Sequence, residues 1–353
     1  MTENSDIQFR VDRGLGCILL NRPKALNALT HEMCVAMHAT MRAWAHDPTI
    51  SALLIEGAGD RAFCAGGDIR KLYDEGRAGG AYPKLFYGDE YRLNAAVHHF
   101  PKPYVAFIDG IVMGGGVGVS VNGSHRVVTE ATTFAMPETG IGLFPDVGGS
   151  YFLARCPGAI GAFLGLTGTR LKAADALYAG LADHFVPQAK LSGVVDALAA
   201  AADSDGDSVN RIIADFAEDA GSPSLAAHRD AIDRCFAGAT VEEVCAALAA
   251  EGTDWADKQQ ATIAAKSPTS LKVALKQIRN GRERSFKDCM AMEWRIVNRV
   301  IAGHDFYEGT RALIIDKDQS PAWSPASLAG VANADVDAYF APLDDGDLTF
   351  DTP

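Results

Sequence analysis

Short apolar runs alternate with amphipathic segments in the first half of the chain, a pattern that predicts strands followed by helices. Ile7, Phe9 and Val11 alternate with polar residues before an Arg13-Gly14 turn, which predicts a hairpin with the apolar run that follows. The predicted strands cover residues 7–11, 17–20, 51–56, 104–108, 126–129 and 133–135.

Helices are predicted between these strands and throughout the second half. Thr30 is a candidate N-cap for a helix that ends near Trp44, another short helix begins at Asp68, and a longer one runs from about Pro83 to His99. After residue 187 the chain becomes Ala-rich and periodic. Helices are predicted there at 190–202, 208–220, 224–237, 240–250, 268–280 and 285–302.

This order predicts an α/β core followed by a helical region. Three parts are expected: a core with the active site over residues 1–200, a helical C-terminal region over 201–320, and an extended tail over 321–353. The acidic stretch 202–208 is the candidate boundary between the first two parts.

Composition limits the classes of partner. The chain has 353 residues, 48% of them apolar and 22% charged, which is ordinary globular usage. Its net charge of −13 disfavours a basic nucleic-acid-binding face, although a small anionic ligand would need only a few local cations. Seven widely spaced cysteines without a C-x-x-C pair predict reduced thiols and no zinc ribbon. No secretory, transit or membrane segment is recognised, so a cytoplasmic location is expected.

Common catalytic signatures are missing from the sequence. There is no P-loop, no H-E-x-x-H zinc motif and no G-x-S-x-G elbow, and the glycines at 114–118 do not complete G-x-G-x-x-G. Two glycine loops remain, C-A-G-G-D-I at 64–69 and M-G-G-G-V-G at 113–118. Amides from two such loops, aimed at one point, would form an oxyanion hole; the alternative is two tight turns without a ligand.

The segment P-E-T-G-I-G-L-F-P-D-V-G-G, residues 137–149, carries two candidate catalytic acids. Glu138 and Asp146 stand among apolar residues, which raise a carboxyl pKa and favour acid or base chemistry. In the alternative, Asp146 caps a helix and Glu138 lies on a surface loop.

Taken together, these motifs resemble the crotonase (enoyl-CoA hydratase/isomerase) superfamily, and most of all its 3-hydroxyisobutyryl-CoA hydrolase branch. The resemblance runs from about Phe9 to Val186 as the superfamily core and continues through the helical half to D-K-D-Q-S-P-A-W-S-P, residues 316–325. It implies the crotonase spiral of ββα units with a helical C-terminal region.

Positions carried over from the family assign roles to individual residues. The oxyanion-hole amides fall on Gly67 and Gly115. The two acids of hydratases fall on Gly118 and Glu138, so the first carboxylate is missing, while Asp146 follows the hydrolase pattern. The resemblance also implies substrate binding by Glu90, Ala65 and Asp68, and coenzyme A binding by Arg22, Lys24 and Ala25. Taken alone, Glu90 would be one charged position on a helix.

The implied activity is hydrolysis of a short 3-hydroxyacyl-CoA thioester, 3-hydroxyisobutyryl-CoA of valine breakdown above all. Glu138 would attack the carbonyl or activate water. Metal and redox cofactors are not expected, coenzyme A arrives with the substrate, and a homo-oligomer is a possible assembly. The alternatives are enoyl-CoA hydration or isomerisation, for which Glu138 alone could shuttle a proton, and a non-catalytic RNA-binding relative.

Overall fold

The computed structural model describes residues 5–201 and 205–350. Its strands within these ranges form a six-stranded sheet in the order β1-β2-β3-β5-β7-β9 and a three-stranded sheet in the order β4-β6-β8. The strands are β1 Ile7–Asp12, β2 Leu15–Leu20, β3 Ala52–Gly57, β4 Ala62–Cys64, β5 Tyr104–Ile108, β6 Ile111–Met113, β7 His125–Val128, β8 Thr133–Ala135 and β9 His184–Phe185.

Each turn of the fold sends one strand to the large sheet and the next strand to the small one. β3 and β4, β5 and β6, and β7 and β8 are such pairs, and the pairs stack in parallel. Among the named strands of the described residues, only β1 and β2 pair antiparallel, as the predicted hairpin. This is the expected spiral of ββα units.

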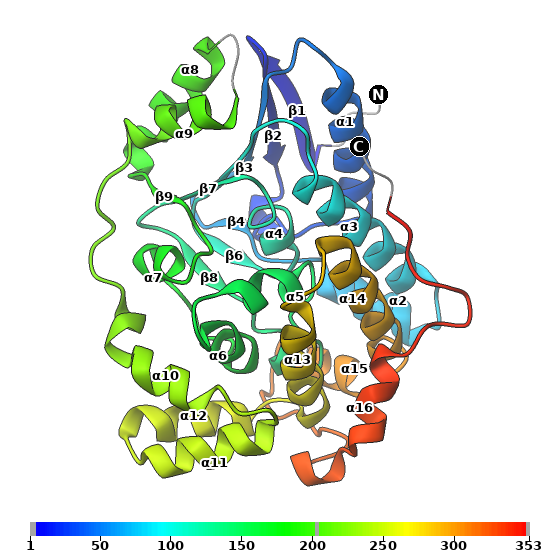
Figure 1. The fold of residues 1–353 in the computed structure, drawn as a ribbon. Helices are drawn as coiled ribbons and strands as arrows, with labels where there is room; N and C mark the ends of the chain where they lie inside the picture. The colour runs from blue at the N-terminus through cyan, green and yellow to red at the C-terminus, as the bar shows by residue number, and fades with distance from the viewer. Residues whose placement is uncertain (1–4, 202–204, 351–353) are drawn as a thin grey trace.

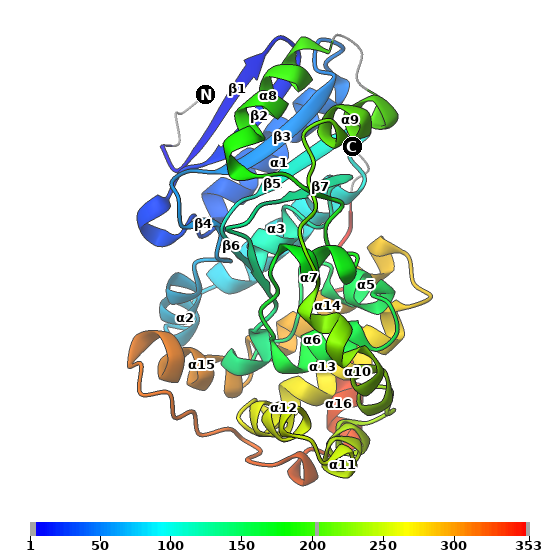
Figure 2. The same cartoon turned by 90° about the vertical axis from the view of Figure 1, so that its left-hand side faces the viewer.

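Helices cover the large sheet on both sides, which explains its uninterrupted apolar strands. Leu54 and Phe107 face α8 and α9, whereas Ile55 and Ala106 face the main core. Figures 1 and 2 show α8 and α9 over the sheet at one end, with α10 to α12 at the other. The helices of the first half are α1 His31–His46, α2 Ile69–Arg77, α3 Tyr82–His98, α4 Gly115–Gly118, α5 Gly149–Phe152, α6 Ile160–Thr167, α7 Ala173–Tyr178 and α8 Leu191–Ala200.

The second half is helical, as predicted, but its boundaries differ from those expected. The predicted helix 208–220 is α9, which begins earlier and ends at Ala214, and 224–237 is a 3-10 turn followed by α10. α12 was not anticipated. The helices are α9 Gly206–Ala214, α10 Arg229–Cys235, α11 Val241–Glu251, α12 Asp254–Ala264, α13 Pro268–Gly281, α14 Phe286–Val300, α15 Asp305–Thr310 and α16 Asn333–Phe340.

The expectation of an extended tail over 321–353 is wrong for α16. Val331 and Val336 are buried, and Arg299 donates to the carbonyl oxygens of Tyr339 (3.2 Å) and Pro342 (3.1 Å), so packing holds the segment in a helix. The division into parts at 200 and 320 stays a prediction. Residues 202–204 of the proposed boundary lie outside the described residues. Within the described ranges, no helix combines the length and apolar character needed to cross a bilayer.

Candidate active site

The two glycine loops lie side by side because the strands before them are neighbours. β4 pairs with β6 in parallel, so the loops that follow these two strands leave the small sheet at the same edge. A Cβ atom built on Gly115 would lie 3.3 Å from the amide nitrogen of Gly67. Neither amide donates to another group of the described chain. The two predicted donors are therefore brought together, and both are available for an oxyanion.

Close packing explains why the second loop consists of glycine. A Cβ atom at Gly115 would lie 2.3 Å from Oε1 of Glu90, and one at Gly116 would lie 2.1 Å from the carbonyl oxygen of Cys64. Any side chain at these positions would push the two loops apart or displace Glu90. The glycines therefore let the second loop lie close to the first loop and to Glu90.

Three acids converge on these loops from separate elements. Glu138 opens a 3-10 turn, Glu138–Ile141, Asp146 follows in the same loop, and Glu90 projects from the middle of α3. Their exposures are 4%, 2% and 2%. The surface alternative for Glu138 and the capping alternative for Asp146 do not describe this arrangement, since the Asp146 carboxylate accepts a hydrogen bond from the Tyr91 hydroxyl at 2.9 Å.

Burial dominates the protonation of these acids. Desolvation raises the pKa of Asp146 to about 7, and the hydrogen bond from Tyr91 opposes this rise. Desolvation also raises the pKa of Glu138 and of Glu90 well above the usual range, and the nearby charge of Asp146 adds to both. Burial therefore favours the neutral form of all three carboxyl groups.

The acids and both glycine loops line one cavity of about 200 Å³. Its other walls are apolar, so charges inside it are poorly screened. The remaining lining residues are Ala65, Gly66, Ile69, Leu72, Phe86, Tyr87, Met113, Gly114, Pro137, Ile141, Leu143, Leu313 and Ile314. We call this space the acid cavity. Cys64, the last residue of β4, is no candidate nucleophile, because burial raises its pKa to about 12.

Comparison with known proteins identifies the family. The enoyl-CoA hydratase/isomerase family profile matches residues 15–340. The chain belongs to this family. A mitochondrial 3-hydroxyisobutyryl-CoA hydrolase of Danio rerio is 46% identical over 349 residues, covering 98% of this chain and 91% of that protein. The Homo sapiens protein of the same name is 45% identical over 340 residues, covering 95% and 88%.

Solved structures agree with the family and its fold. A carnitinyl-CoA dehydratase from Mycobacterium thermoresistibile superimposes with a TM-score of 0.92 at 44% identity, covering 99% of this chain and 100% of that one. An enoyl-CoA hydratase from Rhodobacter sphaeroides 2.4.1 gives 0.91 at 41% identity, with coverage of 98% and 100%. The predicted crotonase fold and the resemblance to the hydrolase branch are confirmed.

Gly118 has no room for a side chain. The family resemblance places the first acid of the hydratases at this position. A Cβ atom on Gly118 would lie 2.6 Å from Nδ2 of Asn94 and 2.7 Å from Cβ of Val147. Asn94 itself is fully buried. The missing carboxylate is thus a structural feature of this family member, since neighbouring side chains fill its space.

The predicted coenzyme A residues form a loop beside the first glycine loop. Arg22 holds this loop by donating to the Ala28 carbonyl oxygen at 2.6 Å and by an ion pair with Asp68 at 3.2 Å. Lys24 and Ala25 form an exposed 3-10 turn. These positions lie outside the acid cavity, and their contact with coenzyme A stays a prediction.

Of the other two predicted substrate contacts, Ala65 lines the acid cavity, whereas Asp68 does not. The Asp68 carboxylate accepts a hydrogen bond from the Lys71 amide at 3.3 Å and so caps α2. With its ion pair to Arg22, that cap gives Asp68 a structural role in this family member. Substrate binding by Asp68 stays a prediction.

Several residues around the cavity were not found from the sequence. Tyr91 binds Asp146, while Leu313 and Ile314, from a π-helical turn at Arg311–Ile315, close one wall. Lys266 is half-buried near Glu138, and burial lowers its pKa. Glu293 is fully buried in α14. Of these, Glu293 alone carried a signal, a single acid within an apolar helical stripe.

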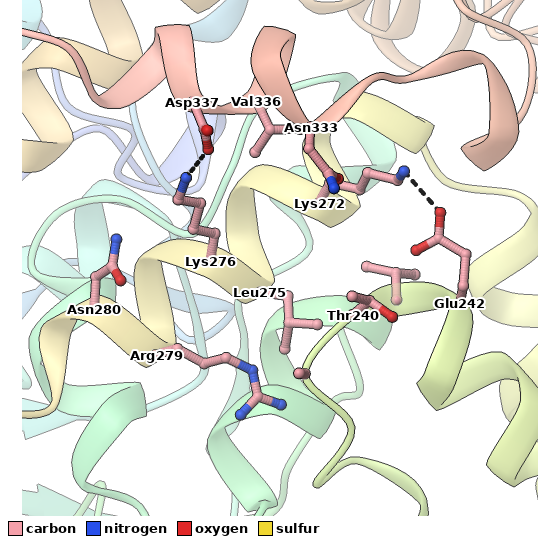
Figure 3. A pocket seen from close by; sticks show the side chains of 12 residues that line it. Thr240, Glu242, Lys272, Leu275, Lys276, Arg279, Asn280, Asn333, Val336 and Asp337 are labelled. Atoms are coloured by element: carbon pink, nitrogen blue, oxygen red, sulfur yellow. Dashed lines mark hydrogen bonds and ion pairs between the residues drawn. The ribbon is translucent and has the colours of Figure 1, made fainter.

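A second cleft, of about 340 Å³, lies between α11, α13 and α16. Figure 3 shows Lys272 and Lys276 of α13 paired with Glu242 and Asp337 across it. Arg279 donates to the carbonyl oxygens of residues 237 and 238. These cations fasten neighbouring segments to α13, and each of the three has a partner within the described chain.

Proposed function

We propose that the protein hydrolyses 3-hydroxyisobutyryl-CoA, a short 3-hydroxyacyl thioester, to 3-hydroxyisobutyrate and coenzyme A. Curated relatives of this name match nearly the whole chain at about 45% identity. The observation that carries the proposal is the acid cavity with Glu138 present and position 118 filled. Alkene hydration in the family uses two acids. This site has the second of them, Glu138, and has glycine in place of the first.

The amides of Gly67 and Gly115 would bind the thioester oxygen. As the carbonyl carbon becomes tetrahedral, negative charge develops on that oxygen, and the two fixed N–H groups stabilise it. Removal of one such donor lowers rates by about 10²–10³-fold in enzymes of this type. The apolar walls strengthen the interaction because they exclude water.

Glu138 supplies the nucleophile by one of two routes. Its carboxylate attacks the thioester carbon, expels coenzyme A thiolate and forms an anhydride that water then hydrolyses. Alternatively it removes a proton from water as the water oxygen attacks. Both routes need ionised Glu138, which Lys266 favours electrostatically and burial opposes. Hydroxylamine traps an anhydride, so formation of a hydroxamate at Glu138 distinguishes the first route from the second.

Asp146 and Glu90 would bind the 3-hydroxyl group of the substrate and share in proton transfer. Asp146 already accepts one hydrogen bond, from Tyr91, and Oε1 of Glu90 has no partner in the described chain. A substrate hydroxyl would give this buried oxygen the partner that it lacks. The proposal requires no metal or redox cofactor, and coenzyme A enters as part of the substrate, with Arg22 and Lys24 near its nucleotide.

Product analysis tests the proposal. Purified protein and 3-hydroxyisobutyryl-CoA should yield 3-hydroxyisobutyrate and coenzyme A in equal amounts by mass spectrometry. Two solved relatives are named as a dehydratase and a hydratase, so an unsaturated or hydrated acyl-CoA is the alternative product to look for. Such a product with no free coenzyme A would overturn the proposal.

Three further expectations accompany it. Homologues named as mitochondrial leave the cytoplasmic location a prediction, which cell fractionation tests. A homo-oligomer stays a prediction for light scattering after gel filtration. RNA binding is disfavoured by the net charge of −13 and is tested by an electrophoretic shift at physiological salt.

A further inference from the structure

The loop that carries Asp146 has a backbone conformation that its own sequence does not favour. Val147 has φ 53° and Gly148 has φ 93°. The left-handed region is natural for glycine, but a β-branched residue such as Val147 adopts it only when surrounding contacts enforce it. This strained residue directly follows a proposed catalytic acid.

Glu293 of α14 binds the loop immediately after the strained residue. Its Oε2 accepts the Gly148 amide at 2.9 Å, and its Oε1 accepts the Ser150 amide at 2.9 Å and the Ser150 hydroxyl at 2.6 Å. Glu293 is 0% exposed. Among the described residues no cation lies beside it, and a buried carboxylate with three donors is costly unless those donors are fixed in place.

Two amides hold the other side of the same turn. Nδ2 of Asn122 donates to the Val147 carbonyl oxygen at 2.9 Å, and Nε2 of Gln277 donates to the Pro145 carbonyl oxygen at 2.5 Å. Neither amide touches the two N–H groups that Glu293 accepts. Within the turn, the Gly149 amide donates to the Asp146 carbonyl oxygen at 2.7 Å, and Glu293 adds the side-chain contacts at its C-terminal end.

We infer that Glu293 is a positioning residue that holds Asp146 in the acid cavity by fixing the strained turn at Val147. The inference rests on the proposed function for its catalytic consequence, but its structural part stands without it. It assigns to a helix of the C-terminal half, more than a hundred residues away in sequence, a role in the chemistry of the first half.

Glu293→Gln is the sharpest variant, because glutamine matches glutamate in shape but replaces one acceptor oxygen with a donor NH₂ group. One of the two backbone N–H groups must then face a donor. Hydrogen exchange of residues 147–150 should accelerate about tenfold, the effect of losing one hydrogen bond. Thioester hydrolysis should fall about 10²-fold, as expected for a misplaced catalytic group, chiefly in kcat.

Asp175→Asn is the matched control. Asp175 is also buried, and it accepts the Ser224 hydroxyl at 2.7 Å and the Leu225 amide at 2.8 Å, away from the cavity. It should leave exchange at 147–150 and kcat unchanged. Ser150→Ala removes one donor without placing a donor against the loop, so it serves if Glu293→Gln does not fold, and should raise exchange there by a few-fold.

The outcomes separate the two proposals. Unchanged exchange at 147–150 in Glu293→Gln, or unchanged exchange in Ser150→Ala if Glu293→Gln does not fold, would overturn the positioning role. If the wild type releases no coenzyme A, the proposed function fails, and the exchange measurement still decides whether Glu293 holds the turn. Fast exchange with full kcat would contradict the catalytic consequence alone.

Discussion

The strand-rich half supplies the polar groups of the acid cavity, most of them from loops and Glu90 from α3, whereas the helical half after residue 205 supplies apolar wall residues and supporting contacts. Gly67, Gly115 and Glu138 come from the first, and Leu313 and Glu293 from the second. In the proposed mechanism the first group faces the reacting atoms, and the second acts through packing or hydrogen bonds. Variants of the first should therefore abolish turnover, and variants of the second should alter position, size limits or pH dependence.

The largest effect is expected at Glu138. Glu138→Gln keeps the shape of the side chain but removes the nucleophile or base, so kcat should fall by about 10³-fold or more. Thiol release from 3-hydroxyisobutyryl-CoA measures it. The exposed Glu283→Gln serves as the control, and activity above a tenth of wild type in Glu138→Gln would remove Glu138 from the mechanism.

Gly115→Ala should come next. The new Cβ atom would lie 2.3 Å from Oε1 of Glu90, so the loop or the acid must move and one oxyanion donor is misplaced. We expect kcat to fall about 10²–10³-fold. Steady-state kinetics check this, and Gly206→Ala, where the nearest atom to the new Cβ would be Cε1 of His125 at 3.9 Å and the backbone is not left-handed, tests whether any glycine substitution has the same effect. Equal losses in the two variants would contradict the oxyanion role.

Leu313→Ala tests a wall of the second half. Removing this side chain enlarges the acid cavity and takes apolar contact from the substrate, so KM should rise about tenfold while kcat changes less. Longer acyl groups should be tolerated better than in the wild type. Kinetics with an acyl-chain series measure this, with Leu85→Ala, 55% exposed, as the control. A large fall in kcat with unchanged KM would contradict the role of Leu313 as a wall that contacts the substrate.

Asp146→Asn should stabilise the empty protein in a pH-dependent way. Burial raises the pKa of Asp146 from 3.8 to about 7, so between these values the native state binds more protons than the unfolded state. Wild-type stability from this group thus falls as pH rises through that window. At pH 8 the variant should gain about 1–3 kcal/mol in the free energy of unfolding, and the gain should shrink toward pH 4. Urea unfolding at both pH values decides; an equal gain at both would contradict this origin.

Tyr91→Phe should have the smallest effect. The hydroxyl of Tyr91 donates to Asp146 and lowers its pKa, so its loss should move the Asp146 titration to higher pH by about one unit. Urea unfolding of Tyr91→Phe between pH 4 and pH 8 measures this shift as a displacement of the pH dependence of stability. Movement to lower pH would show that the hydrogen bond favours the neutral acid instead.

The secondary structure of the strand-rich half was predicted more accurately than that of the helical half, for physical reasons. Strands such as β3 and β5 are buried on both faces, so their apolar runs are unmistakable. α16 was missed because prolines and acids surround it and its helix depends on contacts such as those of Val336. The ends of α9 differ because tertiary contacts, not periodicity, decide where a helix stops.

The site was predictable only through the family resemblance. Spacing alone says nothing of whether Glu138 and Gly67 meet, and the motifs supplied that pairing. Leu313 and Glu293 carry no motif, since a wall or a support is defined by distant neighbours. The sequence therefore did not indicate that residues of the helical half complete the cavity.

The most direct measurement follows two substrates side by side with the wild-type protein. Initial rates of thiol release from 3-hydroxyisobutyryl-CoA and of alkene loss from crotonyl-CoA are recorded at equal concentrations. Because Glu138 lines the acid cavity and neighbouring side chains leave no room for a second acid at position 118, we expect rapid thiol release and at most trace alkene loss. Rapid alkene loss without thiol release would contradict the proposed thioester hydrolysis.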